Sequence, residues 1–239
     1  MELSASEIEE ALSAPSLDNV SILGQDVALA RALEYLETCA ALGGCVEGVY
    51  DTWGFPIYRT SYGGDTDSHW EKLLRMIPQE LSEELDAQQR WEDESRPGNP
   101  EAASQILSLF RLKPFSSPGT LEGASLDRLR QMYKDNRDDL PAKYTADRYH
   151  LFLVADAEVL AAVARGDSWV KIVNPRYRPE DFVIKNRRMG RGLWFIGYMW
   201  MTTRSLLCLW HWLDNRELEL LAPPLLNNQR LTEVWNGVL

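Results

Sequence analysis

Acidic, aromatic and hydroxyl side chains gather in one short stretch of the chain, DTWGFPIYRTSYGGDTDSHWEKLL at residues 51–74. The members that could carry chemistry are Trp53, Tyr58, Arg59, Ser61, Tyr62, Asp65, Asp67, Trp70 and Glu71. Carboxylates beside aromatic rings suit a guanidinium or an amine, because they offer charge-assisted hydrogen bonds and a ring face on which the cation can stack. The stretch therefore predicts a binding site for a cationic group.

Asp65, Asp67 and His69 stand two residues apart, and this spacing offers alternating carboxylate and imidazole ligands to a divalent ion. The same two acids also fit the start of a helix, where the helix dipole favours negative charge. We favour the helix interpretation, and we expect neither a bound metal nor a cofactor.

A second candidate site is a basic run at residues 176–191, RYRPEDFVIKNRRMGR, with six basic residues against two acids. Its basic residues are Arg176, Arg178, Lys185, Arg187, Arg188 and Arg191. Such a run can contact phosphates even on an acidic protein. Most runs of charged residues, however, only form a solvent-exposed face. The formal net charge of −11 and the acidic run at 80–94 argue against a general affinity for nucleic acid.

The elements that must position these residues begin with a strand at 54–62, where β-branched and aromatic residues alternate between two faces. Pro56 places the start of this strand near a sheet edge or at the entry to the sheet. Gly63 and Gly64 allow a sharp reversal after it. A helix is expected next, because Ser68 and Glu71 have the spacing of a capping box.

The apolar face of that helix would hold Trp70, Leu73, Leu74 and Ile77. Pro78 is expected to stop or kink it, and a second, acidic helix would follow at 79–92. The run at 105–115 is ambiguous between a helix end and a strand. A helix at 125–133 would begin at Ser125 as its N-cap.

A second unit of strand, cap and helix follows at residues 149–166. Its strand is expected at 149–155, and Asp156 and Gly166 would begin and end its helix. A further strand at 168–174 would complete a β-α-β unit. We also expect a helix at 26–42, a buried strand or helix at 193–201, and a final helix at 228–236.

The two units predict an α+β fold, a single sandwich built from β-α-β units, of which the ferredoxin-like arrangement is one form. Residues 1–45 would form an N-terminal helical extension, and residues 46–239 a single core domain. The nine Trp are many for this length, and most are expected to pack in the core.

Composition points to an intracellular, cytoplasmic protein. The first twenty residues lack the basic and apolar regions of a secretory signal, and the longest apolar run, at 193–201, is about half the length that crosses a bilayer. Cys39, Cys45 and Cys208 are an odd number without metal-ligand spacing, which suits reduced thiols. The usual motifs for nucleotide phosphates, dinucleotides, serine hydrolases and zinc proteases are absent from the sequence.

Three segments carry a resemblance: WGFPIYRTSYGGDTDSHWEKLL, YHLFLVAD and SWVKIVN. Together they resemble a large group of fungal proteins that includes the arginine-containing cyclodipeptide synthases, and the likeness covers residues 45–200 in outline. It implies an enzyme of fungal natural-product biosynthesis that takes arginine from arginyl-tRNA and joins it to an amino acid from a second aminoacyl-tRNA. The product would be a cyclic dipeptide. Both esters are already activated, so no ATP-binding loop would be needed.

If that implication holds, the candidate residues divide into three groups. The catalytic group would be Ser61, Tyr58 and Glu71, with Ser61 able to receive an aminoacyl group. The arginine-binding group would be Trp53, Arg59, Asp65, Asp67 and Trp70. The basic run at 176–191 would bind tRNA.

Two other functions remain open from the sequence. The first is a non-catalytic intracellular interaction protein that uses a Trp-rich surface, with aromatic and Arg anchors, to bind a protein partner. The second is an enzyme that acts on a cationic metabolite free of tRNA. The net acidity of the chain counts against tRNA as a partner.

Overall fold

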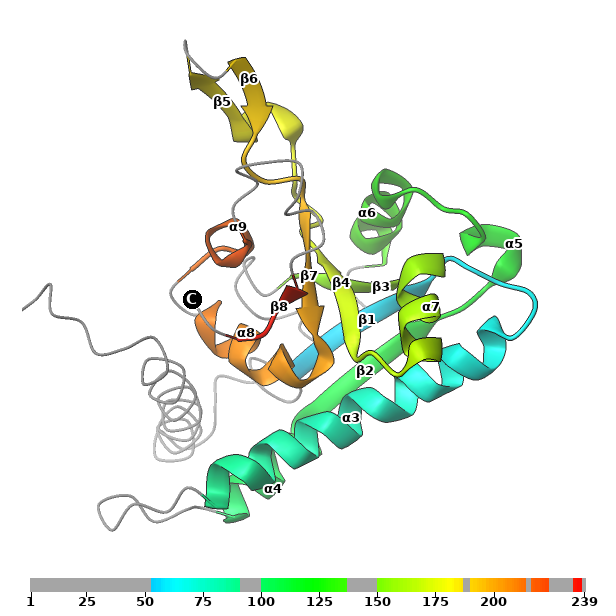
Figure 1. The fold of residues 1–239 in the computed structure, drawn as a ribbon, viewed down its shortest axis with the longest axis vertical. Helices are drawn as coiled ribbons and strands as arrows, with labels where there is room; N and C mark the ends of the chain where they lie inside the picture. Colours follow the sequence, from blue (N-terminus) through cyan, green and yellow to red (C-terminus); the bar gives the residue numbers. More distant parts are fainter. Residues whose placement is uncertain are drawn as a thin grey trace, which may run out of the picture.

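The computed structural model describes residues 53–90, 100–136, 150–186, 190–213, 216–223 and 234–237 (Figure 1). Its elements are, in chain order, β1 (Trp53–Arg59), α3 (Thr66–Arg90), α4 (Pro100–Leu109), β2 (Phe110–Phe115), α5 (Pro118–Leu121), α6 (Leu126–Asp135), β3 (Phe152–Ala155), α7 (Ala157–Arg165), β4 (Trp169–Val173), the 3-10 turn η3 (Pro179–Phe182), β5 (Val183–Asn186), β6 (Gly190–Leu193), β7 (Tyr198–Thr202), the 3-10 turn η4 (Thr203–Ser205), α8 (Leu206–Trp212), α9 (Leu218–Leu221) and β8 (Val234–Trp235). The predicted helix at 26–42, and the extension to which it belongs, lie outside the described residues.

A mixed six-stranded sheet with the order β2-β1-β3-β4-β7-β8 forms the centre of the fold. β1 runs parallel to both β2 and β3, whereas β4 is antiparallel to β3 and β7. The α+β class is confirmed, and the ferredoxin-like form of it stays a prediction. The expected β-α-β unit at 149–174 differs in one respect, because α7 joins neighbouring strands that are antiparallel.

Apolar side chains cover both faces of the sheet. On one face, Ile57 and Leu153 belong to a core cluster with residues of α3, α7 and α8. On the other face, Tyr58 and Val154 pack with Leu129 and other residues of α5 and α6. Successive residues of a strand point to opposite faces, so neighbours in β1 enter different clusters. Figure 1 shows α3 and α7 together over the first face.

α3 runs without interruption from Thr66 to Arg90 and contains Pro78, so the prediction that this proline separates two helices was wrong. The reason lies in the tertiary packing. One face of the helix buries its large side chains completely or almost completely; they are Leu73, Ile77, Leu81 and Leu85. Each is worth about 1.5–3 kcal/mol, and together they exceed the roughly 3 kcal/mol that an internal proline costs.

Pro56 lies at the entry to one strand pairing, as the sequence indicated, although β1 is an interior strand. The N–H of Thr60 donates to the carbonyl of Ala155. Backbone direction alternates along a strand, so the backbone nitrogens of Tyr58 and Pro56 also face β3. The β1–β3 ladder begins only at Ile57. The nitrogen of Pro56 faces β3 just before the ladder begins, so the missing N–H removes no hydrogen bond of that ladder.

Several local predictions are confirmed. Ser125 caps α6 by accepting from the N–H of Arg128, and Asp156 caps α7. Gly166 ends α7 with a left-handed φ of 96°. The ambiguous run at 105–115 contains both structures, because α4 ends at Leu109 and β2 begins at Phe110.

The C-terminal half also supplies corrections. The run at 193–201, predicted as one buried strand or helix, contains the last residue of β6, an irregular stretch at 194–197 and the start of β7. Residues 234–235 form the strand β8 rather than part of a final helix. Among the described helices, none combines the length and the apolar character needed to cross a bilayer.

Candidate functional site

The candidate site lies at the carboxyl ends of the three parallel strands, which together form one edge of the sheet, across the strand direction. β1, β2 and β3 point the same way, and α3, α5 and α7 begin soon after them. Their N-termini therefore come to the same edge (Figure 1). Ligands of open α/β sheets gather at such an edge, because loop atoms and the positive ends of helices converge there.

Arg59, the last residue of β1, joins the strand to the start of α3. Its Nε donates to the carbonyl of Ser61 over 2.8 Å, and its Nη2 donates to Thr66 Oγ1 over 3.0 Å and to the Asp67 carboxylate. The Arg59 side chain is 5% exposed, whereas that of Asp67 is 76% exposed. The ion pair thus consists of a buried cation and a carboxylate at the surface.

Aromatic rings complete the surroundings of Arg59. Its guanidinium carbon lies 4.5 Å from the ring centroid of Tyr62 and 5.9 Å from that of Trp70. The Tyr62 hydroxyl donates to the carbonyl of Arg59 and accepts from the N–H of Ser117, which fixes this ring between two loops. The acidic and aromatic surroundings that the sequence predicted for a bound cation are therefore occupied, in this structure, by a cation of the chain itself.

The start of α3 differs from the predicted capping box. The helix begins at Thr66, so Ser68 lies inside its first turn, and the Ser68 hydroxyl donates to the carbonyl of Asp65 instead of capping an N–H. Gly63 and Gly64 make the reversal with φ of 89° and 56°, as expected for glycines in a tight turn. Asp67 lies in the first turn, which confirms the helix interpretation for this acid.

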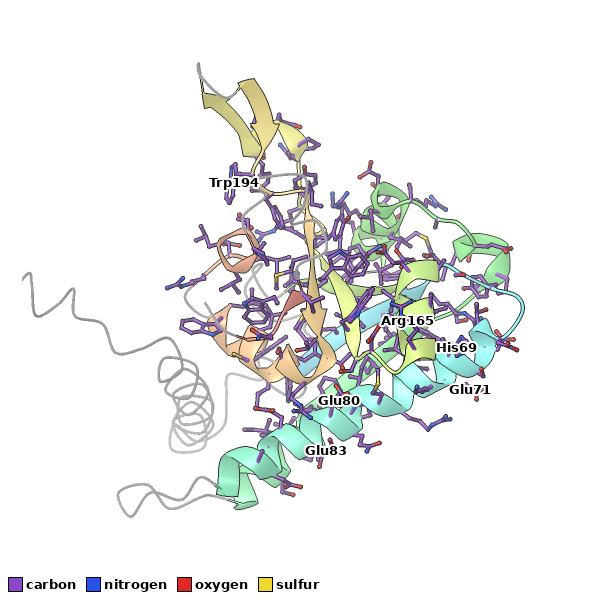
Figure 2. The ribbon with its side chains drawn as sticks, viewed as in Figure 1. His69, Glu71, Glu80, Glu83, Arg165 and Trp194 are labelled. Carbon is purple, nitrogen blue, oxygen red and sulfur yellow. The ribbon has the colours of Figure 1, made fainter. Side chains whose placement is uncertain are left out.

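Four other predicted residues do not join the Arg59 surroundings through their side chains. Tyr58 points to the opposite face, where its ring stacks on Phe115 at 4.8 Å and burial raises its pKa to about 12. Trp53 lies at the far end of β1, and its indole N–H donates to a carbonyl of α4. Glu71 points outward from α3 (Figure 2). Ser61 is half-buried and reaches Arg59 through its carbonyl.

A second polar cluster at the same edge was missed from the sequence. Lys171, in the middle of β4, is 8% exposed, and its Nζ lies 2.5 Å from Asp156 Oδ2 and 3.1 Å from Glu158 Oε2. It also lies 4.0 Å from the ring centroid of Trp200. Asp156 follows Ala155, the residue that pairs with Arg59. The available signal was a lysine inside an apolar strand, SWVKIVN.

The basic run lies elsewhere. β5 and β6 form a hairpin that projects from the sheet (Figure 1), with Lys185 opposite Arg191 in the register. Arg178 is exposed, and Arg176 pairs with Glu217 over 3.3 Å. Arg187 and Arg188 lie outside the described residues. The register thus places two basic residues side by side on the hairpin, and such a pair would give a phosphate a basic place to approach.

The base of this hairpin is an aromatic cluster that ties it to the sheet. Its members are Tyr177, Phe182, Trp194 and Phe195, and the ring centroids of its contacting pairs are 5.2–6.5 Å apart. Arg130 of α6 lies 5.0 Å from the Tyr177 ring centroid. It donates to the carbonyls of Asn174 and Gly197 and to Asp127.

The two candidate sites lie at opposite edges of the sheet. β4 is antiparallel to β3, so its last residue, Val173, pairs with Phe152 at the start of β3. Phe152 and Ala155 are about 10 Å apart along the strand. The chain then leads from Val173 into the hairpin, so the basic run extends away from Arg59. A ligand that touches both sites must span the sheet.

Tryptophan placement bears on the expected Trp-rich surface. In the part of the chain that the structure describes, no Trp is exposed, and the exposed large hydrophobic residue is Leu220. The prediction that most Trp pack in the core is therefore confirmed for these residues.

Comparisons and metal ligands give no further assignment. The described residues contain no group of three His, Cys, Asp or Glu side chains placed to hold a metal ion. A scan of protein-family models and searches of curated proteins and of solved structures find no match to this chain. Function must therefore be argued from the geometry of the site and from the residues themselves.

Proposed function

We propose that this protein is a cytoplasmic, tRNA-dependent cyclodipeptide synthase of fungal natural-product biosynthesis. It would join arginine, delivered by arginyl-tRNA, to an amino acid from a second aminoacyl-tRNA. One observation supports this above the others. The three segments with the resemblance form β1 with α3, β3 and β4, which are neighbours in the sheet, and their polar side chains lie at one edge. Segments that share a function should meet in this way.

The chemistry needs little beyond positioning. The α-amino group of one aminoacyl ester attacks the ester carbonyl of the other, an amide bond forms, and the ribose hydroxyl of the first tRNA leaves with a proton. The remaining amino group then attacks the second ester, which closes the ring and releases the second tRNA. Holding two activated ends together and moving protons between them supplies most of the acceleration.

Asp65 and Asp67 are the residues that would hold the arginine side chain. Asp65 is exposed, and its carboxylate has no partner among the described residues. Asp67 keeps much of its surface open although it pairs with Arg59. In a ping-pong form of the reaction, the Ser61 hydroxyl would first take the arginyl group as the ribose hydroxyl of arginyl-tRNA leaves. The amino group of the second ester would then attack this acyl-enzyme and release Ser61. The proposal gives no chemical role to Tyr58, Trp53 or Glu71, because the fold directs them elsewhere.

The projecting hairpin would contact the tRNA. The basic residues are confined to one segment of an acidic chain, so they can contact only a few phosphates. The affinity for tRNA should therefore fall as the salt concentration rises. The acceptor arm would lie at the hairpin, and its single-stranded end would cross the sheet to the Arg59 edge. The interaction-protein alternative gains no support, because every described Trp is buried or half-buried.

The test is a reconstituted reaction. Purified protein is incubated with arginyl-tRNA and a mixture of aminoacyl-tRNAs, and cyclic dipeptides are measured by mass spectrometry. Arginine-containing products are expected, and Asp65→Asn or Asp67→Asn should lower output by one to two decades, because a charge-assisted pair is worth about 1.5–3 kcal/mol. Asp135→Asn, an exposed acid on α6, is the matched control. Folded protein that yields no arginine-containing product would exclude the proposal.

A further inference from the structure

Arg59 differs from the other buried cations of the described chain in what its charged group contacts. Arg130 uses all three of its nitrogens, on Asp127 and on two backbone carbonyls. Lys171 contacts two carboxylates and the face of Trp200. Buried donors are normally satisfied in this way, because an unmade hydrogen bond is costly.

Arg59 keeps one nitrogen open. Its Nε and Nη2 are hydrogen-bonded, whereas Nη1 has no hydrogen-bond partner among the described residues. Nη1 is not one of the buried atoms that lack a partner, so it reaches solvent although the side chain as a whole is only 5% exposed. The two rings beside the guanidinium hold its plane in place. Nη1 therefore offers two N–H donors on a group whose position is already fixed, and little side-chain entropy would be lost on binding.

The start of α3 adds to the positive character of this place. α3 is 25 residues long, and the N–H groups of Asp67 and Ser68 have no acceptor among the described residues. A helix start of this kind attracts anions through its free N–H groups and its dipole. Asp67 works against it, because its carboxylate neutralises Arg59. Asp65, which is exposed just before the helix, adds a second negative charge. The free N–H groups and Arg59 therefore favour an anion, and these two acids oppose it.

We propose that Arg59 is the central donor of an oxoanion-binding site at the carboxyl edge of β1, for a phosphate or carboxylate group of a ligand. With Nε and Nη2 engaged, Nη1 would donate a single charge-assisted hydrogen bond to an oxygen of either group. This inference goes beyond the proposed synthase and does not require it, because any ligand with such a group would satisfy Nη1. In the synthase, a phosphate of the tRNA end is one such group.

The direction of the Asp67 effect separates this site from a cation site. Removing the Asp67 charge should tighten oxoanion binding about ten-fold, because the carboxylate no longer competes for the guanidinium. A site for an arginine side chain would respond in the opposite direction. If both proposals hold, Asp67→Asn lowers dipeptide output and raises oxoanion affinity in the same protein. The first measurement tests the synthase and the second tests the oxoanion site, so one proposal can be refuted while the other stands.

The experiment follows the Arg59 Nε–H cross-peak by NMR, assigned through its own side chain, during titrations with inorganic phosphate and with acetate at constant ionic strength. Saturable shifts are expected with at least one anion, and the anion that acts identifies the class of ligand. Asp67→Asn should lower the apparent Kd about ten-fold, Asp135→Asn should leave it unchanged, and Arg59→Lys should raise it at least ten-fold. If Arg59→Lys does not fold, Asp67→Asn decides. No saturable shift with either anion, or an unchanged Kd in Asp67→Asn, would overturn the proposal.

Discussion

Replacing Gly197 with alanine should strongly destabilise the hairpin, because the added methyl group has no space. Its φ is +83°, and a Cβ built there would lie 2.4 Å from the Tyr177 ring and 2.5 Å from Arg130 Nη2. Both neighbours are held, Tyr177 by stacking on Phe182 and Arg130 by its hydrogen bonds. Neither can move without breaking the base of the hairpin.

The cost of Gly197→Ala has two parts. A left-handed backbone costs a residue with a Cβ about 1–2 kcal/mol. Displacing Arg130 Nη2 from the Gly197 carbonyl removes a hydrogen bond to a charged group, worth about 1.5–3 kcal/mol. The total is about 2.5–5 kcal/mol. Gly166→Ala is the matched control, because Gly166 has φ of +96° and no atom within 4 Å of its added Cβ, so only the backbone part applies.

Thermal unfolding and hydrogen exchange measure the difference between the two variants. For a chain of this size, about 2–4 °C of melting temperature corresponds to 1 kcal/mol, so the additional ~1.5–3 kcal/mol should make Gly197→Ala melt roughly 3–12 °C below Gly166→Ala. Exchange at residues 183–193 should accelerate in Gly197→Ala alone. Equal melting temperatures in the two variants would refute the close approach of Tyr177 and Arg130 as the reason for this glycine.

Three further predictions concern tRNA, pH and helix α3. Replacing Arg187 and Arg188 with Glu should weaken arginyl-tRNA binding and flatten its salt dependence, and unchanged affinity and slope in filter binding would count against the basic run. Burial raises the pKa of Glu219 above its ordinary 4.5, so unfolding releases a proton and stability is lost as pH rises from 4.5 through the raised pKa. Glu219→Gln should therefore unfold at higher urea than the wild type at pH 7.5 and at the same urea at pH 4. Pro78→Ala should stabilise the protein by about 1–3 kcal/mol, because it restores an N–H donor in α3, and a lower urea midpoint would contradict this.

The sequence predicted those features that depend on neighbouring residues. The caps at Ser125 and Asp156 and the glycine end of α7 depend on side chains one to three residues from the backbone groups that they satisfy. The strand at the start of the site was predicted for the same reason. The order and direction of the strands depend on pairings between distant segments, and they could not be read from periodicity.

The sequence predicted which residue types form the site, but not that a residue of the chain fills the place expected for a bound cation. The acids and rings around residues 59–70 indicated a place for a cation, and the structure places Arg59 there. A pattern cannot tell whether its own arginine or a ligand fills such a place, because both satisfy the same carboxylate. The continuation of α3 through Pro78 was missed for a related reason: a local rule was outweighed by burial against the sheet.

The position of β1 between β2 and β3 has a consequence for the newly synthesised chain. β1 is buried along its whole length, yet one neighbour ends at Phe115 and the other at Ala155. At about 5–20 residues per second, translation needs on the order of 5–20 s after β1 to deliver the second neighbour. During that interval an apolar strand has unpaired edges, the condition in which chains associate wrongly. Pro56 interrupts one of those edges, so it would protect the unfinished protein from pairing with other chains.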